Sequence, residues 1–171
     1  MNTEISATDL TSERDAADGL ALIDAYARDP MGGSAPLPGE VRARLVPDLR
    51  ERIARGAAVV LIARRDGAAM GIAVCFVGYS TFHARPLLNL HDLAVIPEAR
   101  GTGLGQALLA AVAAQARALG CCKVTLEVRE DNARARRVYE YVGFADYSAA
   151  GSAADSALGS ATRTLFLEQK L

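Results

Sequence analysis

The stretch LNLHDLAVIPEARGTGLGQALLAAVAAQARAL, at residues 88–119, predicts a strand, a tight loop and a helix in direct succession. Residues 88–95 are apolar and strand-like, and Pro97 ends the strand because proline cannot donate to a sheet ladder. Gly120 supplies a helix stop. The apolar residues of the helix recur at helical spacing: Leu104, Leu108, Val112, Ala116 and Leu119. Three glycines in the loop 100–105 let amide groups turn inward at the positive end of the helix dipole, which predicts an anion site, most naturally for phosphate.

The spacing of these glycines discriminates between kinds of phosphate-binding loop. The dinucleotide fingerprint G-x-G-x-x-G matches at Gly101 and Gly103, but Gln106 stands where the third glycine belongs. The nucleoside-triphosphate loop requires Gly-Lys-Ser/Thr, and the sequence contains no such run. The arrangement Arg100-x-x-Gly103-x-Gly105 resembles the acetyl-CoA loop of the GCN5-related N-acetyltransferases, (Q/R)-x-x-G-x-(G/A). Taken alone, the loop also fits an ordinary tight turn between a strand and a helix.

A second segment, at residues 126–144, resembles another motif of the same family, a strand followed by N-x-x-A-x-x-x-Y and then G-F. Asn132, Ala135 and Tyr139 occupy the first positions, and Gly143 and Phe144 follow at the matching separation. By this resemblance the chain is identified as a member of the GCN5-related N-acetyltransferase (GNAT) superfamily. The resemblance implies an enzyme that uses acetyl-CoA as co-substrate and transfers the acetyl group to a primary amine by direct attack.

Composition sets the broad class of the protein. The 171 residues predict one domain, 1–171, and 51% hydrophobic with 23% charged residues are globular values. A net charge of −1, 5% aromatic residues and no tryptophan give no case for a nucleic-acid partner. No apolar run reaches membrane-spanning length, and the first ten residues do not resemble a signal peptide. We therefore expect a cytoplasmic protein without a membrane partner.

The three cysteines, Cys75, Cys121 and Cys122, suit reduced thiols in a cytosolic protein. Cys121 and Cys122 are predicted to open a strand, where one of them packs as a small apolar residue. A catalytic thiol is the sharper alternative, but neither has an obvious histidine partner in the sequence. With two histidines and no Cys/His spacing, we predict no metal site.

Periodicity and turn residues predict the element order β-α-α-β-β-β-α-β-α-β-β. The predicted strands are residues 4–10, 57–64, 68–79, 88–95, from 121, from 144, and 162–168; the helices are 12–28, 40–55, 103–119 and from 132. Residues 29–39 and 81–86 are predicted loops, Asp66-Gly67 predicts a hairpin, and 148–161 a mobile connection. The fold class is α+β. The resemblance implies a mixed central sheet with splayed strands 4 and 5, flanked by helices.

In this family, acetyl-CoA lies in the gap between those two strands. Three strand residues would pair their backbone with pantetheine: Leu93, Ala94 and Val95. The backbone N–H groups of the loop and the first helical turn would hold the pyrophosphate: Arg100, Gly101, Thr102, Gly103, Leu104, Gly105 and Gln106. Asn132 would hydrogen-bond the pantetheine arm. The helix after Asn132 carries Arg134, Arg136 and Arg137. One of these arginines would pair with the 3′-phosphate of CoA; the alternative is that they form a solvated basic face.

Three residues are candidates for proton transfer. Tyr139 matches the general acid of the family, which protonates the departing thiolate; the alternative is a core tyrosine on an apolar helix face. Glu127 resembles the glutamate base of the ribosomal-protein alanine N-acetyltransferases; the alternative is a solvated carboxylate at a strand end.

His91 is the second candidate base. The run 89–95 resembles the arylalkylamine acetyltransferases, which carry two histidines where Asn89 and His91 stand. Asn89 also stands where the histone acetyltransferases carry their glutamate base. Strand alternation predicts Asn89, His91 and Leu93 on one face, with Asp92 on the other unless a bulge re-aims it. An imidazole titrates in the range that a base needs.

The acceptor is predicted to be a small-molecule or peptide amine of unknown identity, selected by the first two helices and the loop 29–39. Asp24 and Asp29 there could attract a cationic amine. A homodimer is left open. A CoA-binding regulatory module without turnover is the alternative from another class. A dinucleotide-binding oxidoreductase is disfavoured because only 66 residues follow Gly105, too few for a doubly wound sheet.

Overall fold

The computed structural model describes residues 2–147 and 162–171. In these ranges a seven-stranded sheet has the order β1-β2-β3-β4-β5-β7-β6. Its strands are Thr3–Thr8 (β1), Ala58–Arg65 (β2), Ala68–Ser80 (β3), Arg85–Val95 (β4), Lys123–Arg129 (β5), Ala145–Asp146 (β6) and Thr164–Lys170 (β7). The helices are Glu13–Arg28 (α1), Gly39–Ala54 (α2), Leu104–Ala118 (α3) and Ala133–Tyr141 (α4), with a 3-10 turn at Pro97–Ala99 (η1).

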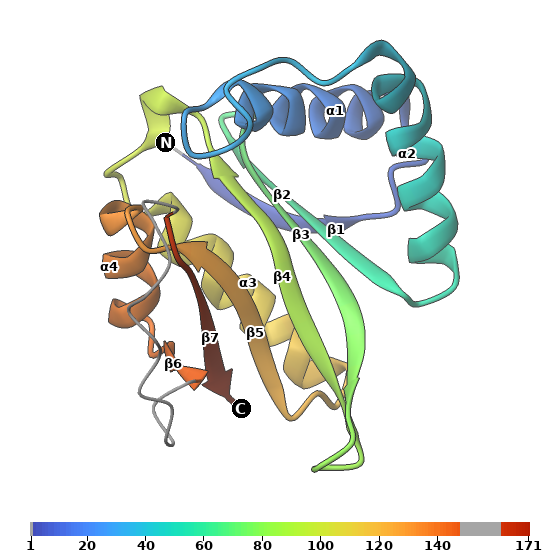
Figure 1. Ribbon diagram of the computed structural model, residues 1–171. Coiled ribbons are helices and arrows are strands. Elements are labelled where there is room, and N and C mark those ends of the chain that lie inside the picture. The colour runs from blue at the N-terminus through green and yellow to red at the C-terminus, as the bar shows by residue number, and fades with distance from the viewer. Residues whose placement is uncertain (1, 148–161) are drawn as a thin grey trace.

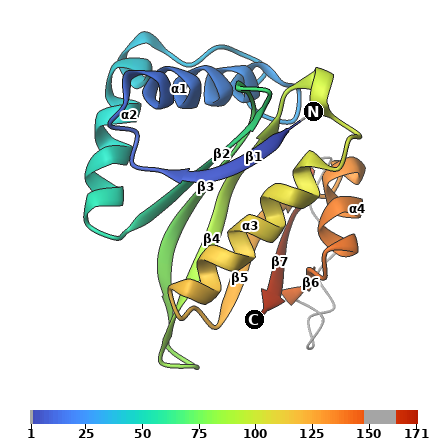
Figure 2. The ribbon, with the colours of Figure 1, turned by 180° about the vertical axis from the view of Figure 1, so that it is seen from behind.

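The topology confirms the predicted α+β class. Strands β1 to β4 form an antiparallel meander, and β4, α3 and β5 form a parallel crossover unit. Figures 1 and 2 show α1 and α2 on one face of the sheet and α3 on the other, beside α4. We refer to the two sides as the α1/α2 face and the α3 face. None of the helices in the described part of the chain is long and apolar enough to cross a membrane.

Local sequence explains how these elements begin and turn. Ser12 caps α1 by accepting a hydrogen bond from the Asp15 amide at 3.0 Å. Asp66 and Gly67, with φ of 48° and 85°, form the predicted two-residue turn between β2 and β3. Gly71 has a packing reason: a Cβ there would lie 2.9 Å from the Ala94 carbonyl oxygen, so only glycine lets these backbones approach so closely.

Each face of the sheet has its own apolar cluster. On the α3 face, the buried side chains of α3 pack on those of β2 to β5. This cluster includes Leu108 and Val112 of α3 and the strand residues Leu61, Leu88, Leu90 and Leu126. On the α1/α2 face a smaller cluster joins both helices to β2, β3 and β4: among them are Leu22, Leu49, Ile62, Ile72 and Ala94. This smaller cluster supports the helices that surround the functional site.

Several predicted boundaries are wrong, for reasons that lie outside the local pattern. β4 begins at Arg85, inside the predicted loop 81–86, because Arg85 and the residues after it pair with the end of β3. β5 begins at Lys123, so Cys121 and Cys122 precede the strand that they were expected to open. The predicted mobile connection, 148–161, lies outside the described residues.

The splayed strands of the predicted fold are present. β4 and β5 pair only at Leu88↔Val124, Asn89↔Thr125 and Leu90↔Leu126, although both strands continue beyond these positions. The end of this pairing coincides with a β-bulge in β4. Cys75 of β3 faces Leu90 and Val74 faces Asp92, which leaves His91 as the extra residue.

The bulge corrects the predicted alternation along β4. Before it, Asn89 faces Phe76 across the strands on the α1/α2 face, and the His91 ring contacts Phe76 on the same side. After it, Leu93 packs with the α3-face cluster, so it does not share a face with Asn89 and His91. Asp92 lies opposite Val74 and therefore faces α1 and α2, on the same side as His91. The bulge thus brings an imidazole and a carboxyl to one side of the sheet.

Candidate active site

The fork between β4 and β5 exposes backbone hydrogen-bonding groups. The Ile96 amide donates to the Met70 carbonyl oxygen at 2.9 Å, which places the polar groups of Ile96 toward β3. Because alternate residues of a strand point their polar groups the same way, Ala94 also bonds toward β3, opposite Ile72. Leu93 and Val95 therefore direct their amide and carbonyl groups into the fork. Of the three strand residues predicted to contact pantetheine, these two have the suitable orientation.

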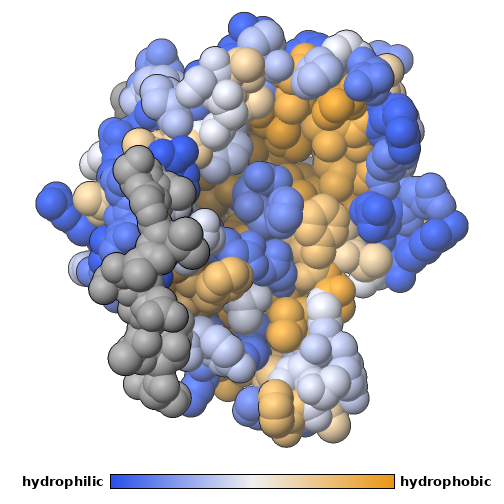
Figure 3. Space-filling view, in the orientation of Figure 1, coloured by the Kyte–Doolittle hydropathy of each residue, from blue (hydrophilic) through white to orange (hydrophobic). Residues whose placement is uncertain are grey.

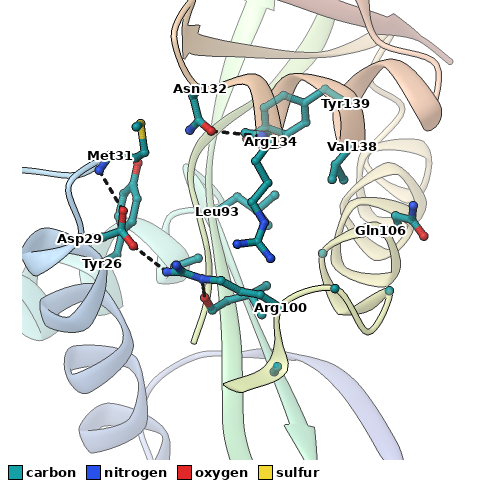
Figure 4. Close-up of a pocket in the computed structure, with 17 residues that line it drawn as sticks. Tyr26, Asp29, Met31, Leu93, Arg100, Gln106, Asn132, Arg134, Val138 and Tyr139 are labelled. Carbon is teal, nitrogen blue, oxygen red and sulfur yellow. Dashed lines mark hydrogen bonds and ion pairs between the residues drawn. The ribbon is translucent and has the colours of Figure 1, made fainter. Parts of the chain in front are cut away.

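A pocket of about 340 Å³ opens from this fork. It extends from the end of α1 across β4 to the loop before α3 and the first turns of α4 (Figure 4). We call it the fork pocket. Its lining includes Tyr26, Asp29, Met31, Leu93, Val95, Arg100, Gly101, Gly103, Gly105, Gln106, Asn132, Arg134, Ala135 and Tyr139.

The N-terminus of α3 forms one end of the fork pocket. Gly101 and Gly103 have φ of 78° and 85°, a left-handed conformation that favours glycine. Gly103 is the N-cap of α3 and offers no side-chain cap, and the first turn carries no acidic residue. The amide groups of this turn are therefore available to an anion at the positive end of the helix dipole. A Cβ on Gly105 would have Val95 Cγ2 as its nearest neighbour, at 4.0 Å, so the protein leaves this space open.

Arg100 links this loop to the segment after α1. Its Nε donates to the Val95 carbonyl oxygen at 2.9 Å, and its Nη2 lies 2.7 Å from Asp29 Oδ2. Asp29 also accepts from the Met31 amide at 2.8 Å (Figure 4). These hydrogen bonds hold the pKa of Asp29 below its usual range, and the bond from the Met31 amide has a larger effect than the bond from Arg100. The Asp29 carboxylate thus holds Arg100 and the Met31 backbone in place at the wall of the fork pocket, and these partners occupy it in place of a substrate amine.

Some of the other predicted co-substrate residues line this pocket and some do not. Asn132 caps α4, its Oδ1 accepting from the Ala135 amide at 3.1 Å, so its Nδ2 remains a donor outside this cap. Arg134 lines the pocket. Thr102, Leu104 and Arg137 stand outside the set of described lining residues. The Leu104 side chain is buried in the core, and Thr102 donates to the Ala99 carbonyl oxygen at 2.7 Å.

A second pocket of about 240 Å³ adjoins the fork pocket on the α1/α2 face. We call it the strand pocket. It contains both candidate bases, His91 and Glu127, together with Arg129. The residues that line both pockets are Tyr26, Met31, Leu93, Asn132, Ala135 and Tyr139. The structure therefore brings Tyr139, Glu127 and His91 to one connected hollow from α4, β5 and β4.

The two tyrosines approach this junction from opposite sides (Figure 4). Tyr139 is 8% exposed, and its ring lies 5.8 Å from the Phe144 ring, centroid to centroid. Burial raises the pKa of Tyr139, and Tyr26 adds to the effect. Burial likewise raises the pKa of Tyr26, and Asp92 and Asp29 add to it. Both hydroxyls are therefore protonated donors at neutral pH.

The two candidate bases are both exposed, but His91 has an aromatic ring and a carboxyl group as neighbours. Glu127 is exposed on β5, and His91 is exposed on β4 with its ring 5.4 Å from the Phe76 ring at 71°. Asp92, next to His91, has a raised pKa because of burial, which His91 partly offsets. Asn89 donates to Thr125 Oγ1 at 3.2 Å and closes the base of the fork.

Two other predicted features have structural roles. Asp24 is 8% exposed and binds the Leu37 amide at 2.9 Å and Arg42 at 2.8 Å. The first of these, with the nearby arginines, lowers the pKa of Asp24 to about 2, so this carboxylate ties down the loop after α1 instead of attracting an amine. All three cysteines are buried, and burial raises the pKa of the Cys75 thiol to about 12, which makes it a poor nucleophile.

Tyr26 and Met31 are site residues that the sequence did not identify. Helical spacing places Tyr26 on the inner side of α1, one turn after Leu22, but spacing does not say that this side ends at the fork. Met31 belongs to a loop without periodicity. Only the packing of α1 against β4 brings both to the junction.

Comparisons with known proteins agree with this geometry. A model of the acetyltransferase (GNAT) family matches residues 22–144. The chain is 32% identical over 96 residues to the uncharacterized N-acetyltransferase YhfO of Bacillus subtilis, covering 56% of this chain and 64% of that protein. It is 35% identical over 81 residues to thialysine N-epsilon-acetyltransferase of Bos taurus, covering 47% of each. The chain thus spans less than two thirds of the length of these curated relatives.

Solved structures share the fold at low sequence identity. YncA of Salmonella typhimurium, described as a putative acetyltransferase with its cofactor acetyl-CoA, has a TM-score of 0.75 at 19% identity, covering 99% of this chain and 94% of that chain. The PaiA N-acetyltransferase of Thermoplasma acidophilum, in complex with coenzyme A, has a TM-score of 0.71 at 15% identity and covers 100% of both. With the family model matching well over half of its length, the chain belongs to the GNAT acetyltransferase family.

Proposed function

We propose that this protein is an acetyl-CoA-dependent N-acetyltransferase that acetylates a primary amine. The junction of two pockets at Tyr139 carries the proposal. One pocket offers a strand edge and a helix N-terminus, and the other offers candidate bases. A transferase for two substrates needs such a meeting point, because the reacting groups must come within attacking distance.

The residues of the fork pocket fit acetyl-CoA. The open amides at the start of α3 suit a diphosphate, and the open space at Gly105 lets it approach. Leu93 and Val95 present a strand edge to the amide-bearing arm, with Asn132 as a further donor and Arg134 as a partner for a phosphate. Membership of the GNAT family and the co-substrates named for the two solved relatives support the same ligand.

The proposed mechanism assigns one proton transfer to each side of the junction. Acetyl-CoA supplies the thioester: its carbonyl carbon forms a bond with the amine nitrogen, and the C–S bond breaks with its electron pair on sulfur. Glu127 or His91 takes the proton that the amine loses. Tyr139 donates its hydroxyl proton to the sulfur and regains a proton from solvent, while the base returns its proton to solvent. A neutral amine and acetyl-CoA therefore give the N-acetyl amine and CoA thiol with no net gain or loss of protons.

Amine-dependent release of CoA thiol tests this function. We expect thiol release from acetyl-CoA to increase on addition of an accepted amine, with an equal amount of N-acetyl product seen by mass spectrometry. A panel of hexylamine, lysine, spermidine and an alanyl peptide covers the main amine classes. Binding of acetyl-CoA without transfer to any amine would instead favour a CoA-binding regulatory module.

The pH dependence of kcat/KM identifies the base. A base acts only when unprotonated, so kcat/KM falls as the pH drops through its pKa and gives an acidic limb. We propose Glu127 as the base, since its spacing to Tyr139 matches the family motif, and expect Glu127→Gln to lose this limb while His91→Gln keeps it. The reverse result would transfer the role to His91. If both variants keep the wild-type profile, neither residue is the base.

We propose a single domain over residues 1–171, a cytoplasmic location and an acceptor that is a small molecule or a peptide. A homodimer is the arrangement to test by sedimentation.

A further inference from the structure

A third hollow lies on the same face of the sheet, between α2 and the end of β3. Its volume is about 520 Å³, and its apolar wall consists of Val41, Leu45, Leu49 and Phe76. We call it the α2 groove. Leu49 belongs to the buried cluster of the α1/α2 face, and Leu45 and Phe76 are half-buried against that cluster. Val41 is 37% exposed. The groove therefore offers apolar surface to a ligand while its base is fixed by the core.

The α2 groove is the neighbour of the strand pocket. Phe76 lines the groove, His91 lines the strand pocket, and their ring centroids are 5.4 Å apart. The two residues stand on adjacent strands, which lie about 4.8 Å apart. One aromatic pair thus separates the groove from the hollow that holds Glu127 and Tyr139. A ligand with its reacting end in the strand pocket can place its other end on Phe76.

The surface around the groove agrees with an apolar ligand. Figure 3 shows hydrophobic surface gathered between α1 and α2 over the sheet, with hydrophilic groups around it. Apolar lining with a polar surround is the usual composition of small-molecule pockets, where burial of hydrocarbon supplies affinity. The volume of the groove suits a short alkyl chain or a single ring.

The charges at the groove balance each other. Glu40 and Asp48 face Arg44 and Arg52 around its rim. Arg44 and Asp48 form an ion pair at 3.4 Å, and the Arg52 guanidinium lies 5.9 Å from the centre of the Phe76 ring. Two carboxylates and two guanidiniums give no net charge, so the rim favours neither a cationic nor an anionic tail.

We propose that the α2 groove binds a neutral apolar substituent of the amine that this enzyme acetylates. The inference rests on the proposed function and narrows its substrate class. The amine nitrogen lies in the strand pocket near Glu127 and Tyr139, and the hydrocarbon passes His91 and packs on Phe76. The groove residues then determine which amines are accepted without taking part in the chemistry.

Four amines with the same six-carbon chain test the proposal: hexylamine, 6-aminohexan-1-ol, 6-aminohexanoate and 1,6-diaminohexane. All present the same primary amine, so differences report on the tail alone. We expect kcat/KM for hexylamine to exceed that for each charged analogue at least about tenfold, with the alcohol between them. Saturation-transfer NMR without acetyl-CoA should show the chain-end methyl of hexylamine in contact with the protein.

A charge placed in the groove should invert this preference. Val41→Asp puts a carboxylate on the exposed side of the groove, in the first turn of α2 where an acidic residue is tolerated. We expect kcat/KM for hexylamine to fall about 10- to 100-fold and the ratio of 1,6-diaminohexane to hexylamine to rise by at least about tenfold. Ala43→Asp adds the same charge to an exposed position of α2 outside the groove lining and should change neither.

The results separate this inference from the proposed function. Equal kcat/KM for the four amines, an unchanged order in Val41→Asp, or a hexylamine methyl that makes no contact would each overturn the groove assignment and leave the acetyltransferase assignment standing. Acetyl transfer to no amine would overturn the proposed function, and this inference with it.

Discussion

Tyr139→Phe should lower kcat for acetyl transfer about 10²- to 10⁴-fold while leaving the acetyl-CoA dissociation constant unchanged. The substitution removes one hydroxyl and keeps the ring that packs 5.8 Å from Phe144, so the buried environment of α4 is retained. The loss reflects a thiolate that must leave without a proton donor. Because burial raises the pKa of Tyr139, its hydroxyl stays protonated above neutrality, and the wild-type kcat should show no alkaline limb from it below about pH 10.

Tyr141→Phe is the matched control for this experiment. Tyr141 ends the same helix but is 77% exposed, so loss of its hydroxyl should change neither kcat nor affinity. Steady-state kinetics with a fixed amine, together with calorimetry of acetyl-CoA, measures both quantities. If Tyr139→Phe turns over as fast as Tyr141→Phe, Tyr139 is only a core residue.

Gly105→Val should weaken acetyl-CoA binding more than about 100-fold, or ~2.7 kcal/mol. The valine methyl groups would occupy the space that the protein leaves open beside the amides of α3, where the pyrophosphate would lie. Gly103→Val should also abolish binding, but Gly103 has φ of 85°, so a side chain there strains the backbone as well. Gly105 lies inside α3 and has no positive φ, so a valine there should fill the ligand space without straining the backbone.

Gly39→Val controls for the cost of valine at the start of a helix. Gly39 opens α2, and a Cβ there meets nothing within 4 Å, whereas a Cβ on Gly105 meets only Val95 Cγ2 at ordinary contact distance, 4.0 Å. Both variants should fold, as judged by circular dichroism, and only Gly39→Val should bind acetyl-CoA normally by calorimetry. Unchanged affinity in a folded Gly105→Val protein would mean that the phosphates bind elsewhere.

The parts of the fold that the sequence predicted are those with local physical signals. The glycines at 101 and 103 need positive φ, and the apolar spacing after them gives α3 its buried face. Two ordered motifs then identified the family and the splayed sheet, and both predictions are confirmed. The roles given to Tyr139, Glu127 and His91 stay predictions, although the structure brings the three residues to one junction.

The features that the sequence did not predict depend on distant pairing. The bulge at His91 arises from the register between β3 and β4, and a period of two along β4 carries no sign of it. The contact of Arg100 with Asp29 joins residues 71 positions apart. Asp24 was predicted as a possible partner for a cationic amine because its actual partners, the Leu37 amide and Arg42, are placed only by the folded loop.

Binding of acetyl-CoA in the fork between β4 and β5 is tested most directly by thermal denaturation with acetyl-CoA and with NAD. At a hundred times its dissociation constant, acetyl-CoA should stabilise the wild-type protein by about 2.7 kcal/mol, seen as a rise in Tm. NAD should leave Tm unchanged, since the glycine pattern departs from the dinucleotide fingerprint at Gln106. Equal shifts with both ligands, or a shift with NAD alone, would contradict the acetyl-CoA site.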